Sequence, residues 1–286
     1  QALGVFSTGP CNLLIEDNCS FTDLNVAVTV WEADASIEDA AFERNGTALS
    51  VSGQNVSTTT CIFSNTNQRS LTAGLVSITE SSVYADSGST FLSPMLFQFN
   101  SQNTFNGSNI QTTAVITGLG RDCNVTMTDC TLSGPVNMNI QNYTSGTRPG
   151  DALISLNNCQ METTTRFVVI EGEGTVSING GTFTGYSGDV MLNVNHPLGV
   201  ISLNGAGDSL AEKLDLSPVI SGGTIIVGRA SAGAISLTNV TASQLPPGFL
   251  ESWSDAGQGS LLGNVLIEYD QCAFFNGSGC YNANLN

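Results

Sequence analysis

Charge is scarce in this sequence of 286 residues, in which Asp, Glu, Lys and Arg make up 11% of the chain. An average soluble protein has about a quarter. Seven basic residues stand against 24 acidic ones, which gives a formal net charge of −17 at pH 7. Binding to nucleic acid requires a basic surface, and so does attraction to anionic lipid headgroups. The sequence therefore predicts no nucleic-acid partner and no binding to an anionic membrane.

The sequence also lacks any apolar run of about 18 residues, so we expect no membrane-spanning segment. It lacks the C-x-x-C spacing of many zinc sites and the G-x-S-x-G motif of serine hydrolases. The one histidine, His196, stands in Asn195-His196-Pro197 without a marked nucleophile or acid beside it. We therefore predict no catalytic residue, no cofactor, and a structural or surface role for His196.

Cysteines and glycosylation motifs are plentiful. The eight cysteines are an even number, which suits disulfides formed in an oxidising compartment. Gln1 suits the first residue that remains after removal of a signal peptide. These features predict a secreted, extracellular glycoprotein with N-linked glycans. The sequon N-x-S/T occurs at Asn18, Asn45, Asn55, Asn106, Asn124, Asn142, Asn239 and Asn276.

A short phrase of the type apolar-Ser-apolar returns along the chain, most clearly in Val176-Ser177-Ile178. The residue after the second apolar position is polar, and the fifth or sixth residue after it is mostly apolar. Each unit therefore indicates a short strand, a polar turn and a second short strand. Aligned on the second apolar position, the anchors are Ile15, Ile37, Val56, Ile78, Phe99, Met127, Leu156, Ile178, Leu203, Leu237 and Ile267.

Units of about 22 residues with this pattern resemble the coils of a right-handed parallel β-helix, as in the pectin-lyase-like superfamily. The resemblance covers residues 12–275 and depends on periodicity, because no signature motif of the family is present. It implies an all-β fold, a single-stranded right-handed parallel β-helix of about 10–11 coils with side loops. We expect one domain, residues 1–286, with cap regions at 1–20 and 268–286. Asn157, Asn179 and Asn204 should stack as a ladder in successive coils.

The cysteines fit this arrangement in part. Cys130 and Cys159 share a column in adjacent coils, where stacking at about 4.8 Å suits a disulfide. Cys11 with Cys19, and Cys272 with Cys280, are close in sequence and would hold the two ends of the solenoid. Cys61 and Cys123 then remain, three coils apart in this alignment. These further candidates are Cys11–Cys19, Cys272–Cys280 and Cys61–Cys123, with Cys123–Cys130 as a rival.

Asp17 and Asp39 share a column, two positions after the anchor, in adjacent coils. Stacked carboxylates of this kind are weak candidates for binding Ca²⁺. The alternative is that both side chains bond the backbone of turns. Polygalacturonases of the similar superfamily carry N-T-D, D-D, G-H-G and R-I-K motifs, and this sequence has none of them.

We expect a structural or adhesive protein, a building block of an extracellular fibre, flagellar hair, wall or surface coat. Its partners would be copies of itself or other matrix and fibre proteins. One alternative is a polysaccharide lyase or hydrolase of the pectin-lyase-like class, and another is a carbohydrate-binding or attachment module. An exposed aromatic cleft would favour the binding module. The two tryptophans, Trp31 and Trp253, lie near opposite ends of the sequence.

Overall fold

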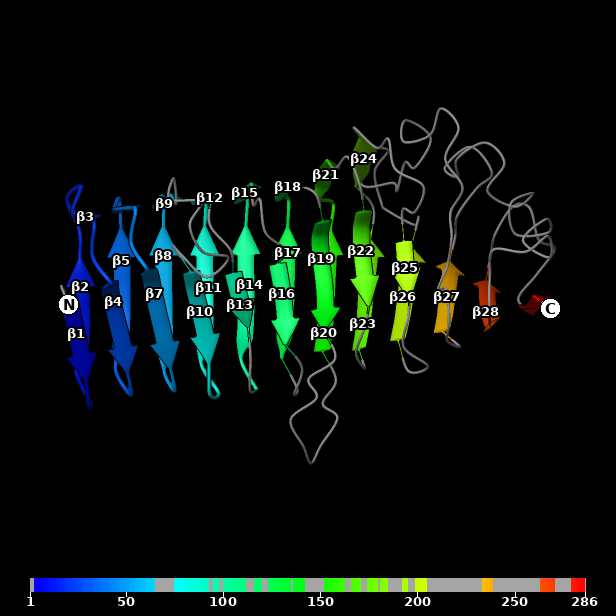
Figure 1. Ribbon diagram of the computed structural model, residues 1–286, viewed down its shortest axis with the longest axis horizontal. Helices are drawn as coiled ribbons and strands as arrows, with labels where there is room; N and C mark the ends of the chain where they lie inside the picture. The colour runs from blue at the N-terminus through cyan, green and yellow to red at the C-terminus, as the bar shows by residue number, and fades with distance from the viewer. Residues whose placement is uncertain are drawn as a thin grey trace.

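The protein is a rod of stacked β-strands (Figure 1). The computed structural model describes residues 3–64, 75–92, 95–97, 100–111, 116–119, 123–134, 136–141, 152–162, 166–170, 174–179, 181–184, 192–194, 199–204, 233–238, 263–270 and 279–285. Within these ranges every regular element is a strand. The prediction of an all-β fold is therefore confirmed.

The strands form three sheets, each built from every third strand of the chain. Sheet A contains β1 (Leu3–Thr8), β4 (Val26–Trp31), β7 (Thr47–Ser52), β10 (Leu75–Thr79), β13 (Met95–Phe97), β16 (Ile116–Leu119), β19 (Val136–Gln141), β22 (Arg166–Ile170) and β25 (Leu192–Val194). Sheet B contains β2 (Asn12–Ile15), β5 (Asp34–Glu38), β8 (Asn55–Thr59), β11 (Val83–Ser87), β14 (Gln102–Asn106), β17 (Asn124–Thr128), β20 (Ala152–Asn157), β23 (Gly174–Asn179), β26 (Gly199–Asn204), β27 (Gly233–Thr238), β28 (Gly263–Asp270) and β29 (Gly279–Leu285). Sheet C contains β3 (Ser20–Thr22), β6 (Ala41–Glu43), β9 (Ile62–Ser64), β12 (Thr90–Leu92), β15 (Asn109–Gln111), β18 (Thr131–Ser133), β21 (Gln160–Glu162) and β24 (Thr182–Thr184).

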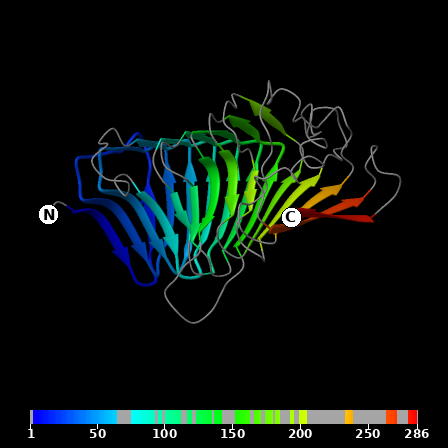
Figure 2. The same cartoon turned by 45° about the vertical axis from the view of Figure 1, so that its right-hand side comes forward.

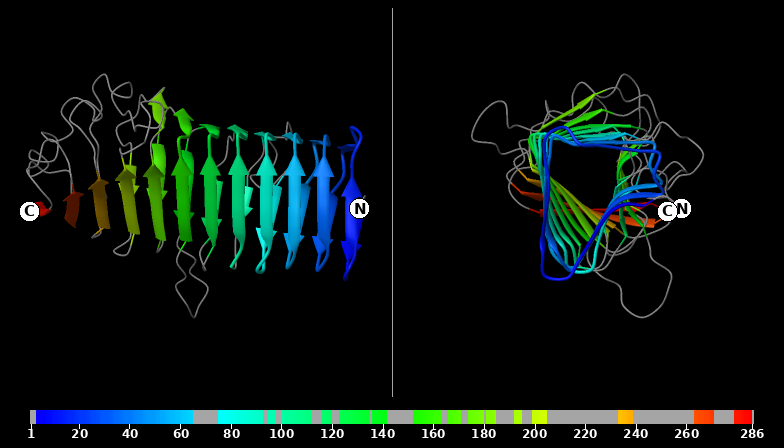
Figure 3. Two further views of the ribbon diagram at one scale, coloured as in Figure 1. Left: turned by 180° about the vertical axis from the view of Figure 1, so that it is seen from behind. Right: turned by 90° about the vertical axis from the view of Figure 1, so that its left-hand side faces the viewer.

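Each coil of the rod contributes one strand to each sheet, and equivalent strands of successive coils pair in parallel. The described strands complete eight such coils, since sheet C has eight strands, and sheets A and B continue beyond them. At the C-terminal end, β29 pairs with β28 antiparallel. Figure 2 shows the coils in a turned view, and the end-on view in Figure 3 shows the three sheets around a common interior. The fold is the predicted parallel β-solenoid.

Alternation along the strands directs one set of side chains into the rod. In β5 the buried residues are Ala35 and Ile37, and their neighbours are exposed. On sheet C the inner row begins with four phenylalanines, Phe21, Phe42, Phe63 and Phe91. Their rings stack with centroid distances of 5.1, 4.7 and 4.8 Å. The coil spacing thus carries a row of aromatic contacts through the core.

The turn between sheets B and C depends on a residue in the left-handed conformation. Asp39, Asp129 and Asn158 have φ values of 50°, 53° and 51°, and Gly88 and Gly107 occupy equivalent positions at 69° and 60°. The backbone N–H of each donates to a carbonyl in the next coil, at 2.8–3.1 Å. Asp, Asn and Gly adopt this conformation at the least cost. Their recurrence at this turn therefore maintains the register between successive coils.

The predicted row of anchors is correct at its start and wrong in the next three coils. Ile15 faces Ile37, as predicted, but Ile37 then faces Thr58, which faces Asp86. Val56, which the sequence predicts in this row, faces Ala35 and Tyr84. Ile78 belongs to β10 of sheet A. The alignment failed because Thr58 and Asp86 are polar although they point inward, with 1% and 2% exposure.

The row is correct again over five further coils. Met127, Leu156, Ile178, Leu203 and Leu237 face one another in register. Leu237 then faces Tyr269 in place of the predicted Ile267, which is displaced by two residues. A displacement of two keeps a side chain on the same face of the sheet.

Candidate functional site

The outer face of sheet B is the most regular surface of the described chain. Three rows of outward side chains run along the rod, and we call them together the sheet B face. The first row is Asn12, Asp34, Asn55, Val83, Gln102, Asn124, Leu153 and Thr175. The second row is Leu14, Ser36, Ser57, Ala85, Thr104, Thr126, Ser155 and Ser177. The third row is Glu38, Thr59, Ser87, Asn106, Thr128, Asn157 and Asn179.

Polar side chains on this face bond to their equivalents in the next coil. Asn124 Nδ2 donates to Gln102 Oε1 at 2.8 Å, and Asn179 Nδ2 donates to Asn157 Oδ1 at 2.9 Å. The second bond confirms the first step of the predicted asparagine ladder, and Asn204 follows Asn179 in register. These bonds link neighbouring coils, so the sheet B face presents ordered short side chains.

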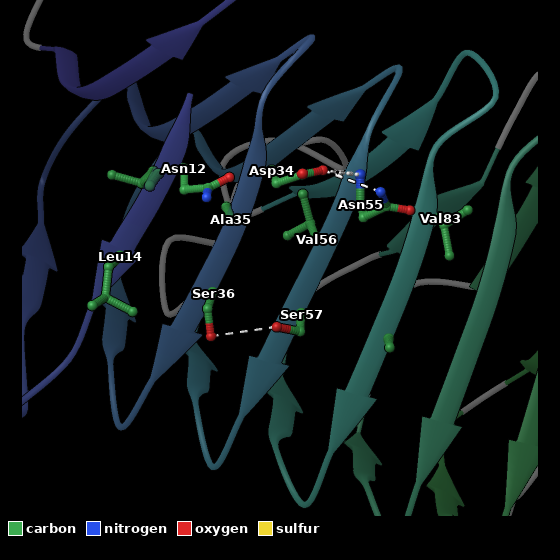
Figure 4. A pocket seen from close by; sticks show the side chains of 11 residues that line it. Asn12, Leu14, Asp34, Ala35, Ser36, Asn55, Val56, Ser57 and Val83 are labelled. Carbon is green, nitrogen blue, oxygen red and sulfur yellow. Dashed lines mark hydrogen bonds between the residues drawn. The ribbon is translucent and has the colours of Figure 1, made fainter. Parts of the chain in front are cut away.

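A shallow groove crosses the sheet B face over the first four coils (Figure 4). Leu14 and Val83 lie in it, with 61% and 46% exposure. Asn55 donates to Asp34 Oδ1 through its backbone N–H at 3.2 Å and its Nδ2 at 3.1 Å. Ser57 Oγ donates to Ser36 Oγ at 3.4 Å. The groove therefore has an exposed apolar side chain toward each end, with hydrogen-bonded polar side chains between them.

Three of the predicted glycosylation asparagines lie on the sheet B face. Asn55 and Asn106 are exposed, and Asn124 is half-buried. Asn18 is exposed in the turn between β2 and β3, with φ 58°. These four side chains are therefore placed where a glycan can extend into solvent. Asn142, Asn239 and Asn276 lie outside the described residues.

Asn45 has a different environment from the other described sequon asparagines. The residue is 1% exposed. Its Oδ1 accepts from the Leu24 backbone N–H at 2.9 Å, and its Nδ2 donates to the Phe21 carbonyl at 2.9 Å. A glycan on Nδ2 would require an open path to solvent, which this buried side chain lacks. Asn45 therefore serves to hold two coils together.

Cys130 and Cys159 lie side by side in adjacent coils, as predicted. Gln160 N, next to Cys159, donates to the Cys130 carbonyl at 2.9 Å. Both residues are buried free thiols. The interaction with the neighbouring Cys130 thiol, followed by burial, raises the pKa of Cys159 above its ordinary value. The pair is close enough to interact directly, and its disulfide stays a prediction.

Two other predicted disulfides join cysteines that the structure places apart. Cys11 precedes β2 and Cys19 follows it, and both are exposed free thiols. The intervening strand of four residues alone spans about 10 Å, beyond the usual Cα separation in a disulfide. Cys61 precedes β9, and Cys123 precedes β17.

The second of these predicted disulfides is Cys61–Cys123. Cys61 follows the C-terminal end of β8, whereas Cys123 precedes the N-terminal end of β17. In sheet B, β11 and β14 lie between these two strands. The alternative pair, Cys123–Cys130, is also separated, because strand β17 lies between the two cysteines. Burial raises the pKa of the Cys61 thiol. Cys272 lies outside the described residues, so the pair Cys272–Cys280 remains a prediction.

Asp17 and Asp39 occupy turns, with φ values of 63° and 50°. The Asp39 carboxylate accepts a hydrogen bond from the Thr60 hydroxyl. Among the described residues no group of three or more His, Cys, Asp or Glu could hold a metal ion. Asp17 and Asp39 therefore lie in turns, and neither the calcium site nor the bonding of turn backbones by their side chains is tested. His196 lies outside the described ranges.

A buried polar cluster inside the rod had no counterpart among the predicted sites. Asp86 accepts hydrogen bonds from Thr58 and Ser108 at 2.5 Å, and the Tyr84 hydroxyl lies 2.6 Å from Thr58 Oγ1. Burial, followed by the nearby Asp86 charge, raises the pKa of Tyr84 well above its ordinary value. The cluster is internally bonded, and its side chains link three coils. One signal could have revealed it, namely the interruption of the apolar row at Thr58 and Asp86.

Comparisons with known proteins do not extend this picture. No protein-family model, curated protein or solved structure matches the chain. In the part of the chain that the structure describes, no helix is both long and apolar enough to cross a membrane.

Proposed function

We propose that this chain is a secreted structural glycoprotein, a right-handed β-helical rod of the pectin-lyase-like type that builds an extracellular fibre, wall or surface coat. The observation that carries the proposal is the placement of Asn55, Asn106 and Asn124, three sequon asparagines, on one face of a continuous rod. Glycans there would make the sheet B face the solvent-facing side of an assembly. The ends and the other two sheets would then remain for contacts between rods.

The N-terminal end of the rod favours such contacts. Among the described strands, β1, β2 and β3 each have a sheet neighbour on one side only. Open strand edges offer unpaired N–H and C=O groups to further strands, of the same protein or of another chain. The large apolar side chain of Phe6 on β1 is 56% exposed. Another copy, or a related fibre protein, would cover these groups.

Mapping of occupied sequons in the secreted protein by glycopeptide mass spectrometry tests the proposal. We expect glycans on Asn55, Asn106 and Asn124, because their side chains reach solvent. Asn45 provides the internal control, since its side chain is buried and should be unmodified. Unmodified asparagines at all three positions of the sheet B face would contradict the proposal.

A further inference from the structure

A second groove lies where the chain passes from sheet A to sheet B, and it contains the exposed tryptophan. Its lining comes from four successive coils: Gly9, Pro10, Trp31, Glu32, Ser52, Gly53, Gln54 and Glu80. Trp31 ends β4 and is 51% exposed. A tryptophan buries about 150–250 Å² when it is enclosed, so half-exposure leaves a large apolar ring surface in water. An unburied indole inside a groove indicates a surface for a ligand.

Small residues keep this groove open on both sides of Trp31. In sheet A, Trp31 pairs with Thr8 in the preceding coil and Ser52 in the next. The residues that follow those partners are Gly9 and Gly53, with φ values of 80° and 82°. A Cβ on Gly9 would meet nothing within 4 Å, and one on Gly53 would lie 3.9 Å from Glu32 Cγ and 3.7 Å from the Glu80 carbonyl. Glycine thus leaves room between the two glutamates.

The two glutamates supply hydrogen-bond acceptors beside the ring. Ser52 Oγ donates to Glu80 Oε2 at 2.6 Å, which fixes this carboxylate at the groove. Among the described residues, ion pairs join Arg44 to Asp23 and to Glu43, and none involves Glu32 or Glu80. An ionised carboxylate accepts hydrogen bonds only, whereas the Gln54 amide both donates and accepts. The groove therefore suits a ligand with an apolar face and several hydroxyl donors.

We propose that this groove binds a pyranose ring of a neutral glycan. The apolar C–H face of the sugar packs on the Trp31 indole, Glu32 and Glu80 accept from its hydroxyls, and Gln54 completes the polar contacts. Anionic glycans are rejected, because the protein carries a net charge of −17 and the groove itself holds two carboxylates. This proposal goes beyond the structural role and does not depend on it.

The sugar has two possible sources with the same chemistry. One is an external glycan, such as a wall polysaccharide. The other is the N-glycan expected on Asn55, which directly follows the groove residue Gln54 in the chain. The test must distinguish an empty groove from one that the protein's own glycan fills.

Tryptophan fluorescence provides the test, because the chain has only two tryptophans. In a full-length Trp253→Phe protein, the emission reports on Trp31 alone. The probes are cellohexaose, mannohexaose and chitohexaose as neutral glycans, with a galacturonate hexamer as the anionic control. We expect a saturable change in emission with at least one neutral probe and none with the anionic one.

Two variants locate the site by calorimetry. Trp31→Ala should weaken binding about 30-fold, as expected for a central aromatic contact. Glu80→Gln should weaken it about tenfold, as expected for a hydrogen bond to a charged acceptor. Far-UV circular dichroism verifies that each variant folds, and Ser133→Ala on the outer face of sheet C is the matched control that should bind normally.

Glycosylated protein and Asn55→Gln protein distinguish the two sources. A response in both forms assigns the groove to external glycans. A response only after Asn55 is replaced shows that the protein's own glycan occupies it. Either outcome supports the site. The proposal is overturned if no neutral probe changes Trp31 emission in either form, or if the Trp31→Ala variant binds as tightly as the parent.

Discussion

Asparagine has several distinct roles in this rod, and the environment of each residue decides which applies. Asn45 is enclosed and bonds to the backbone of the preceding coil at both Leu24 and Phe21. Asn158 adopts a left-handed turn conformation, and Asn157 bonds along the rod to Asn179. Asn106 is exposed within a sequon. A motif search treats Asn45 and Asn106 alike, because burial is a property of the fold and not of three consecutive residues.

Replacement of Asn45 by alanine should destabilise the rod. The Leu24 N–H and the Phe21 carbonyl would lose their partner in a partly buried site. The expected cost is about 2 kcal/mol of unfolding free energy. Chemical denaturation of protein freed of N-glycans measures it. Asn106→Ala, which also removes a sequon but on the exposed face, should change stability by less than about 0.5 kcal/mol. Equal effects of the two substitutions would contradict the assigned role of Asn45.

The strands show how far the sequence alone predicts this fold. The apolar-Ser-apolar phrase correctly identified β20, β23, β26 and β27, whose central serines face one another in register. The same phrase in Val76-Ser77-Ile78 misled the alignment, because it belongs to sheet A. A two-residue period identifies a strand but not the sheet to which it belongs. Assignment to a sheet requires the length of each coil, which varies with its loops.

The candidate sites were predictable to different degrees. The sequons and Trp31 are visible in the sequence, whereas their grouping on one face or in one groove follows from the coil register. The groove beside Trp31 combines residues from Gly9 to Glu80, over four coils. The buried contacts of Asp86 were missed because a carboxylate is normally expected at the surface.

The aromatic row of sheet C should be a main source of stability at the N-terminal end. Phe42 is fully buried and stacks on Phe21 and Phe63 at 5.1 and 4.7 Å. Phe42→Ala should cost about 3–5 kcal/mol, because the removed ring leaves a cavity between two coils. Guanidinium unfolding measures this loss. Ile62→Ala removes an apolar side chain that is 48% exposed on the adjacent strand β9, so it should have a much smaller effect. A comparable loss for both variants would show that the row is not central.

At the scale of the whole molecule, the rod is a stack with two different ends. Eleven parallel strands of sheet B, spaced about 4.8 Å apart, give it a length of roughly 50 Å. One end presents open strand edges and exposed apolar side chains, and at the other end β29 pairs with β28 antiparallel. A long, weakly charged solenoid with sequons along one face fits a structural element. If the proposed groove beside Trp31 takes an external glycan, it would attach such an element to a polysaccharide.

Electron microscopy of the native material, with antibody labelling of this chain, tests the structural role most directly. The account predicts that the label decorates filaments, layers or coats in which the rods pack in a regular arrangement, with the sheet B face outward. It would be contradicted by a dispersed monomer that releases reducing sugars from polysaccharide. That result would establish the alternative role of a polysaccharide-cleaving enzyme.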